Sequence, residues 1–265
     1  MQRVVSPQNP RLRAALALIA SSRERRKTGR CVLEGVHLLQ VYVQRVGAPD
    51  PLIVADEALA NDEVRALLAR VPPDNVLAVP ARLLAEHTAL PPHANVLGVV
   101  ATPRGRASQQ ASFTLMLEDV QDPGNVGSIL RTAAAAGVDQ VLLSATCAFA
   151  WSPKVLRAAQ GAHFLTGIAE DVDLVAWTAG LRARKGRAVA TVARGGADVY
   201  TLPLTTPLAI AIGNEGAGLS AALVDACDLR ATIPMAADNE SLNAAAAAAA
   251  VLFEAVRQRR SVKHR

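Results

Sequence analysis

Short aliphatic runs alternate along this chain with longer stretches that have the spacing of amphipathic helices. The basic stretch 7–30 has a helical period, with Leu12, Leu16 and Ile19 as its apolar stripe. The β-branched runs that follow are separated by helical stretches, and they predict strands at residues 31–35, 51–56, 75–80 and 95–102. The first hundred residues therefore predict a small α/β domain.

The polar segment 103–111 has no apolar period and is predicted to be a linker, after which the α/β rhythm starts again. Strands are predicted at 113–119, 140–145, 187–193, 207–213 and 228–235, with helices at 125–137, 152–164 and 241–260. Gly137 has the position of a helix-ending glycine. Continuous apolar strands that alternate with helices predict a mostly parallel sheet with both faces covered. We expect residues 1–104 to form one domain, 105–111 a linker, and 112–265 a second domain with a basic tail.

Charge is distributed unevenly in a chain whose net charge is only +5. Residues 1–30 carry a net +7 and residues 257–265 carry +5, so the rest of the chain is acidic with −7. Basic ends on an acidic body are compatible with polyanion binding and equally with solubilising tails. Aromatic residues make up only 3% of the chain, which argues against a surface that stacks sugars or many bases.

Cellular context is predicted from the cysteines and from the apolar runs. Cys31, Cys147 and Cys227 are far apart and have no metal-ligand spacing, so we expect core thiols, a reducing compartment and no metal. We find neither a signal-peptide pattern nor an apolar run long enough to span a membrane. These features predict a cytoplasmic protein that does not bind membranes.

Three segments carry polar residues where strands meet helices. In the first, 117–137, a strand runs through a Gly/Pro/Asn turn into a helix that contains Asn125 and Arg131. The carboxyl end of a parallel strand and a new helix N-terminus are common ligand positions. An ordinary turn, with Arg131 paired to a nearby acid, explains this segment equally well.

The second segment, 209–220, breaks a buried strand with three glycines that surround Asn214 and Glu215. Their G-x-x-G-x-G spacing is neither the dinucleotide fingerprint nor a P-loop, so a nucleotide-phosphate site is disfavoured. In the third segment, 233–254, Asp238 or Asn239 is predicted to cap a helix whose first turn contains Ser241 and Asn243. An asparagine inside an alanine helix lowers helix propensity, so Asn243 is expected to have a partner.

Together, DPGNVGSILRTA (122–133), AIAIGNEGAGLS (209–220) and IPMAADNESLNAAAA (233–247) resemble the SpoU/TrmH family of RNA ribose 2′-O-methyltransferases. The resemblance covers about residues 112–257 and implies an α/β fold whose mostly parallel sheet is threaded into a SPOUT-type trefoil knot. Residues 6–18 and 25–39 resemble the small ribosomal-protein-like RNA-binding domain often fused in front. Composition and periodicity alone would predict an unknotted sheet.

The resemblance also implies site residues and a cofactor. S-adenosylmethionine would be bound by Gly213, Ile233 and Leu242, largely through the backbone. The family's catalytic positions match five polar residues: Asn125, Arg131, Glu215, Ser241 and Asn243. Relatives often have a glycine where this chain has Ala237, which could narrow the cofactor loop. Because a guanidinium stays protonated, Arg131 is expected to grip the ribose and phosphate rather than act as a simple base.

The expected substrate is structured RNA, most often ribosomal RNA, and the family implies a homodimer formed through the knot domain. The expected phosphate contacts are Arg11, Arg23, Arg25, Arg26, Lys27 and Arg30. Housekeeping and antibiotic-resistance methylation remain equally open. Two alternatives are an RNA- or ribosome-binding assembly factor without turnover and a dinucleotide-dependent oxidoreductase, which the glycine spacing disfavours.

Overall fold

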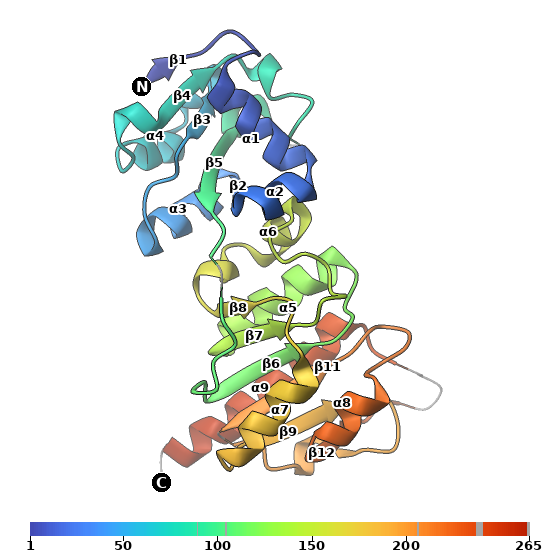
Figure 1. Cartoon of the computed structure of the whole chain (residues 1–265). Coiled ribbons are helices and arrows are strands. Elements are labelled where there is room, and N and C mark those ends of the chain that lie inside the picture. The colour runs from blue at the N-terminus through green and yellow to red at the C-terminus, as the bar shows by residue number, and fades with distance from the viewer. Residues whose placement is uncertain (89, 104, 206, 237–240, 264–265) are drawn as a thin grey trace. The chain divides into compact units, whose positions relative to one another are not determined.

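The computed structural model describes residues 1–88, 90–103, 105–205, 207–236 and 241–263. The chain forms two compact units, one made of Met1–Pro103 with Trp151–Phe164 and the other of Arg104–Ala150 with Leu165–Arg265 (Figure 1). Ala237 and the predicted helix caps Asp238 and Asn239 lie outside the described residues.

The N-terminal unit is built on a five-stranded sheet with the order β1-β4-β3-β5-β2. Its strands are β1 (Gln2–Arg3), β2 (Arg30–Glu34), β3 (Leu52–Ala55), β4 (Val76–Val79) and β5 (Val96–Ala101). The central strand β3 pairs parallel with β4 and antiparallel with β5, so this sheet is mixed. All four residues of β3 and of β4 are buried, which is why these runs are apolar throughout.

The basic segment 7–30 forms two helices, α1 (Pro10–Ala20) and α2 (Ser22–Thr28), and the prediction of one continuous helix is wrong. Ser21 adopts an extended conformation and accepts a hydrogen bond from the Glu24 N–H, so it ends one helix and caps the next. The buried stripe of α1 is Leu12, Ala15 and Leu18, whereas Leu16 and Ile19 are only half-buried. The unit also contains α3 (Val36–Arg45) and α4 (Asp62–Leu68).

Residues 151–164 leave the C-terminal unit and pack within the N-terminal one. Helix α6 covers only Pro153–Ala159, shorter than predicted, because Gln160 and Gly161 take positive φ values of 50° and 90°. The Arg157 guanidinium donates to the buried Glu34 carboxylate at 3.1 Å. The ring of Phe164 meets that of Tyr42 edge-on, with centroids 5.1 Å apart.

The C-terminal unit contains a seven-stranded sheet in which every pairing is parallel, with the order β10-β12-β9-β11-β6-β7-β8. Its strands are β6 (Phe113–Leu117), β7 (Gln140–Leu143), β8 (Gly167–Ala169), β9 (Arg187–Thr191), β10 (Ala197–Asp198), β11 (Leu208–Ile212) and β12 (Leu229–Thr232). Strands β6 and β11 are buried throughout, as the continuous apolar runs predict.

Helices cover both faces of this sheet (Figure 1). Helices α7 (Leu174–Ala183) and α8 (Ala221–Ala226) pack over a core that includes Met116 and Trp177. On the other face, α5 (Pro123–Ala135) packs along α9 (Ala244–Lys263), and the Arg259 guanidinium lies 4.4 Å from the centroid of the Phe113 ring. Gly137 has φ +72° immediately after the last turn of α5, which confirms it as the helix-ending glycine.

Candidate active site

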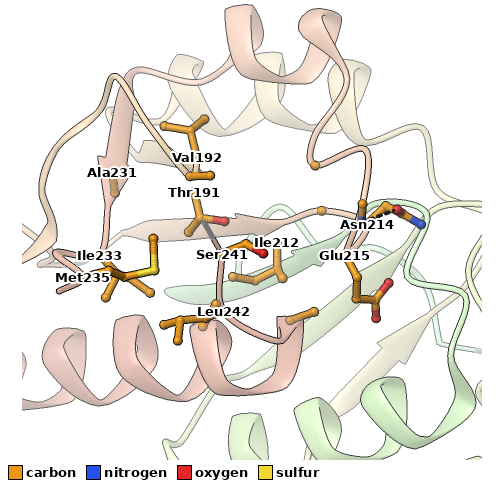
Figure 2. A pocket seen from close by; sticks show the side chains of 16 residues that line it. Thr191, Val192, Ile212, Asn214, Glu215, Ala231, Ile233, Met235, Ser241 and Leu242 are labelled. Atoms are coloured by element: carbon orange, nitrogen blue, oxygen red, sulfur yellow. Dashed lines mark hydrogen bonds between the residues drawn. The ribbon is translucent and has the colours of Figure 1, made fainter. Parts of the chain in front are cut away.

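A cavity of about 290 Å³ lies at the carboxyl ends of the neighbouring strands β9, β11 and β12. Figure 2 shows Ile233 and Met235 on one side and Glu215 on the other, with Leu242 contributed by the segment that leads into α9. The three predicted cofactor residues, Gly213, Ile233 and Leu242, all line this cavity, as does Ser241. Three parallel strands that end at one edge, with the start of α9, bring together residues up to 56 positions apart in the chain, from Thr191 to Ala247.

The wall formed by residues 213–218 is a tight backbone loop. The N–H and C=O groups of Asn214 and Gly218 exchange hydrogen bonds of 3.0 Å each. The Asn214 side chain also accepts from Gly216 N–H at 2.9 Å and donates to the Asp119 carbonyl at 2.9 Å. A Cβ atom on Gly213 would lie 2.3 Å from the carbonyl carbon of Gly218, so glycine is required here for the backbone to approach itself.

The segment that links β6 to α5 runs beside this loop. Asp122 caps α5 by accepting from the Asn125 N–H at 2.8 Å. Glu118 accepts from the N–H and the hydroxyl of Ser220 at 2.7 and 2.8 Å. These bonds, with the Asn214 anchor, tie the ends of β6 and β11 together and thereby position Asn125 and Glu215.

Three predicted catalytic residues form one hydrogen-bonded chain. The Asn243 amide donates to Asn125 Oδ1 at 2.9 Å, and the Asn125 amide in turn donates to Glu215 Oε1. The carboxylate at one end can only accept, so it sets the direction of both amides. Asn125 is thus joined in a single polar group to Glu215, which is 90 positions away in the chain, and to Asn243, which is 118 positions away.

The prediction that Ser241 and Asn243 lie in the first turn of the last helix is wrong. Helix α9 begins at Ala244, and Asn243 Oδ1 accepts from the N–H groups of Ala245 and Ala246 at 2.9 and 3.3 Å. Asn243 is therefore the N-cap, which removes the propensity cost of an asparagine inside the helix. Its expected partner is present, since its amide contacts Asn125.

Arg131 is exposed on α5 and has no hydrogen bond or ion pair to any residue that the structure describes. It is not brought into the Asn243–Asn125–Glu215 chain, and it does not line the cavity. The described residues therefore give its guanidinium no structural partner, which is the arrangement expected of an arginine that contacts a ligand.

The six predicted RNA-binding residues fall into three groups. Arg25 is buried and donates to the carbonyls of Leu18 and Ile19, and burial lowers the pKa of its guanidinium; it fastens α2 to the end of α1. Arg11 and Arg30 both bond to Asp50. Arg23, Arg26 and Lys27 are exposed on α2.

Sequence reasoning missed several residues of the cavity wall. Thr191, Val192 and Met235 line it, and Asn214 shapes the loop. The only available signal was their position at strand ends, and for Asn214 its place between two glycines of the second segment. Among the described residues there is no cluster of three or more His, Cys, Asp or Glu side chains that could hold a metal ion. Within the same residues, no helix is long and apolar enough to cross a membrane.

The lining suits a ligand held mainly through backbone contacts. It combines aliphatic side chains with the backbone of the glycine-rich loop, and Glu215 is its one ionisable side chain among the described residues. Such a site can orient a molecule with a largely apolar body while the polar chain lies at its edge.

Comparison with known proteins adds to this geometry. The model of the SpoU rRNA Methylase family matches residues 112–253. The chain is 32% identical over 238 residues to the 23S rRNA (guanosine(2553)-2′-O)-methyltransferase RlmP of Bacillus subtilis, covering 88% of this chain and 91% of that protein. It is 32% identical to the 23S rRNA (uridine(2479)-2′-O)-methyltransferase of Streptomyces viridochromogenes, over 97% and 93% of the two chains.

A similar solved structure is the SpoU methyltransferase AviRb of Streptomyces viridochromogenes in complex with AdoMet. Its TM-score is 0.85 at 30% identity, and the match covers 96% of this chain and 99% of that one. The AdoMet-bound rRNA methyltransferase of Sinorhizobium meliloti matches with a TM-score of 0.82 at 28% identity, over 97% of both chains. These matches confirm the predicted fold class, an α/β protein of the trefoil-knot SPOUT type with a mostly parallel sheet.

Proposed function

We propose that this chain, which belongs to the SpoU rRNA methylase family, transfers a methyl group from S-adenosylmethionine to a ribose 2′-hydroxyl of ribosomal RNA. The observation that carries the proposal is the cavity beside the Asn243–Asn125–Glu215 chain. Two of the segments in which the sequence resembles the family line the cavity, and the third contributes Asn125 to the chain. Two relatives are 2′-O-methyltransferases of 23S rRNA, one acting at a guanosine and the other at a uridine.

Gly213, Ile233 and Leu242 would hold the cofactor in the cavity, which fits it because a glycine-rich backbone and aliphatic side chains form the wall. The cofactor supplies an activated methyl group, so the protein's own contribution is positioning and charge stabilisation. No metal is needed for this chemistry.

Arg131 binds the ribose and its neighbouring phosphate and stabilises the negative charge that develops on the hydroxyl oxygen. This role is supported by the exposure of Arg131 on α5, the helix that also carries Asn125, and by the lack of a partner for its guanidinium among the residues that the structure describes. Asn125, Glu215 and Asn243 form the polar group that positions the substrate, and Ser241 contributes a hydroxyl to the cavity wall.

Arg131→Lys tests the role of the planar fork, since it keeps the charge and loses bidentate geometry. We expect a loss of kcat with unchanged binding of S-adenosylmethionine. Arg187→Lys is a matched control, because Arg187 is exposed at the opposite, amino end of β9. Near-normal turnover of Arg131→Lys would exclude bidentate gripping.

The N-terminal unit serves as the RNA-binding domain, with 105–111 as the linker of the predicted division. Arg23, Arg26 and Lys27, exposed on α2, contact phosphates, with Arg11 and Arg30 nearby; Arg25 is left out because it is buried. Changing these three exposed residues to Gln should weaken rRNA binding and flatten its dependence on salt. The same change at Arg45, Arg70 and Arg82, which are exposed elsewhere on the unit, removes equal charge and is the control.

The protein acts as a homodimer through the C-terminal unit, in the cytoplasm where rRNA substrates are found. Support comes from α9, where Phe253 is 49% exposed on the helix that also carries the exposed Ala246 and the partly exposed Ala249 and Ala250. Such an apolar face is expected to be covered by a second copy. Analytical ultracentrifugation should give a dimer, and Phe253→Asp should give a monomer; a monomeric wild-type protein contradicts the proposal.

The alternative of an assembly factor without turnover is not favoured, because the polar chain is intact. Incubation with tritiated S-adenosylmethionine and 23S rRNA lacking the modification decides between the two. We expect label at one ribose 2′-oxygen. Tight rRNA binding without incorporated label would overturn the enzymatic assignment, and calorimetry with NAD serves as the cofactor control.

A further inference from the structure

The N-terminal unit contains a cavity of its own, with a volume of about 450 Å³. Its walls are α1, α2, the first residue of β2, the turn at Asp50–Pro51 and the middle of β5. This volume lies within the range of roughly 300–1,000 Å³ that is typical of small-molecule sites. The proposed function assigns no ligand to this cavity, although Arg11 and Arg30 in its wall lie near the proposed phosphate contacts.

The interior of the cavity is aliphatic. Ala14, Ala15 and Leu18 from α1 and Val99 from β5 line it together with Pro51. Ala14 is exposed although it lies in the middle of the helix, so the cavity leaves room above a small side chain. An apolar interior of this kind takes the face of a flat, largely apolar group.

Two arginines line the same cavity and are held by its wall. Arg11 donates to the Asp50 carboxylate at 2.6 Å and to the Asp74 carbonyl at 3.1 Å, and Arg30 donates to the Asp50 carbonyl. These bonds are made by N–H groups at the edges of the guanidinium planes, which do not use the flat faces. Guanidinium planes stack on nucleobases, so they can take the place of an aromatic side chain, of which the described residues of the wall contain none.

The surroundings favour an anionic occupant. Helix α2 contributes Glu24 and Thr28 to the cavity wall and exposes Arg23, Arg26 and Lys27. The apolar cavity suits the base of a nucleotide, and the neighbouring cations of α2 suit its phosphates. The Glu24 carboxylate adds an acceptor for the N–H groups on the edge of a base.

We propose that this cavity binds one unpaired nucleobase of the RNA substrate while the flanking phosphates contact α2. The base must be unpaired because a base inside a helix cannot present its faces to a protein, whereas loops and bulges can. The inference rests on the proposed RNA-binding function and adds to it a site that reads RNA by an extruded base.

Ala14→Leu tests the proposal by filling the cavity from α1 without changing charge or helix propensity. Ala20→Leu is the matched control, since Ala20 is exposed on the same helix and does not line the cavity. The full-length proteins are compared for binding to 23S rRNA and to a 12-nucleotide single-stranded RNA, with the corresponding duplex as a further probe. Melting curves and calorimetry with S-adenosylmethionine verify that each variant is folded.

We expect Ala14→Leu to weaken binding of 23S rRNA and of the single-stranded RNA about tenfold, as for loss of one stacked base, with an unchanged salt slope. Duplex binding and the Ala20→Leu variant should match the wild type. If Ala14→Leu melts early, Arg30→Lys replaces it: it keeps the charge, loses the flat face and should show the same loss.

Wild-type affinity in the folded Ala14→Leu protein would overturn the base site while leaving the methyltransferase intact, as would an equal loss in Ala20→Leu. A wild-type protein that neither binds nor labels 23S rRNA would instead overturn the proposed function. The two failures are therefore distinguishable.

Discussion

Asn243 combines two functions that one substitution can separate. Its side-chain oxygen caps α9, and its amide nitrogen donates to Asn125, which donates to Glu215. Asn243→Asp keeps the cap and the size of the side chain but replaces the donor with a second acceptor. Asn243→Ala removes both functions.

The expected magnitudes follow from these contacts. Loss of an N-cap costs about 1 kcal/mol, and loss of one hydrogen bond about another 1 kcal/mol. Asn243→Ala should therefore lower the free energy of unfolding by about 2 kcal/mol, which is roughly 2–4 °C in Tm for each kcal/mol. Asn243→Asp should lose much less stability, because a carboxylate is a good cap and also interacts favourably with the helix dipole.

Asn243→Asp should lose activity even though it keeps most of its stability. In this variant a carboxylate lies on each side of Asn125, one from Glu215 and one from the new aspartate. The Asn125 amide nitrogen can donate to only one of these carboxylates, so the amide oxygen must face the other. We expect kcat to fall about tenfold, corresponding to about 1.4 kcal/mol, with little change in the affinity for S-adenosylmethionine. Tritium transfer to rRNA gives kcat, and calorimetry gives the affinity.

Two results would refute this reasoning. Equal melting temperatures for the Asp and Ala variants would show that Asn243 does not act as a cap. Wild-type kcat in Asn243→Asp would show that the direction of the amide chain has no part in turnover. Asn243→Ser provides a control, since it retains a capping oxygen and introduces no charge.

Other predictions follow from the cavity and from the buried ionisable groups. Gly213→Ala should abolish binding of S-adenosylmethionine in calorimetry because its Cβ would lie 2.3 Å from the Gly218 backbone, whereas Gly216→Ala, with only a 3.6 Å contact, should bind normally. Burial raises the pKa of the Cys31 and Cys227 thiols to about 12, so the unfolded chain releases protons that the folded chain retains. The free energy of unfolding should then fall as the pH rises from about 9 to 12, and Cys31→Ala should flatten that slope in melting experiments. Hydrogen bonds from Arg257, and then Gln258, lower the pKa of the Glu254 carboxyl. The stability that this carboxylate contributes is fully present above the ordinary pKa of 4.5, and it is lost as the pH falls through the lowered pKa of the folded protein. Glu254→Gln should therefore reduce the dependence of Tm on pH in the acid range, between about pH 3 and 5. If Tm of the variant falls with acid as it does in the wild type, Glu254 does not contribute to stability in this way.

The parallel strands of the C-terminal sheet were predictable because their burial on both faces leaves continuous apolar runs, as in β6 and β11. Strands at edges were not. β8 and β10 have three and two residues, too short for a period to be recognised. The start of α9 was placed too early because several polar residues before the alanines can cap a helix, and only the tertiary contact with Asn125 favours Asn243.

Sequence could place the polar site residues in one region because parallel strands end at a common edge. It could not show which of them touch: Arg131 remains outside the hydrogen-bonded chain, although it shares α5 with Asn125. Nor could charge alone distinguish Arg25 from its neighbours. Its inward direction depends on the break at Ser21, which turns α2 against the end of α1.

Residues 151–164 belong to the N-terminal unit although they lie within the C-terminal half of the sequence, and this limits how the unit can be exchanged between related proteins. Because α6 supplies Arg157 to Glu34, and Phe164 packs against Tyr42, the N-terminal unit is encoded by two separate stretches of the gene. A fragment cut at Pro103 would leave the buried Glu34 carboxylate without its guanidinium. Exchange of this unit between relatives therefore requires a double crossover, and a single junction in the segment 105–111 would produce a mismatched chimera.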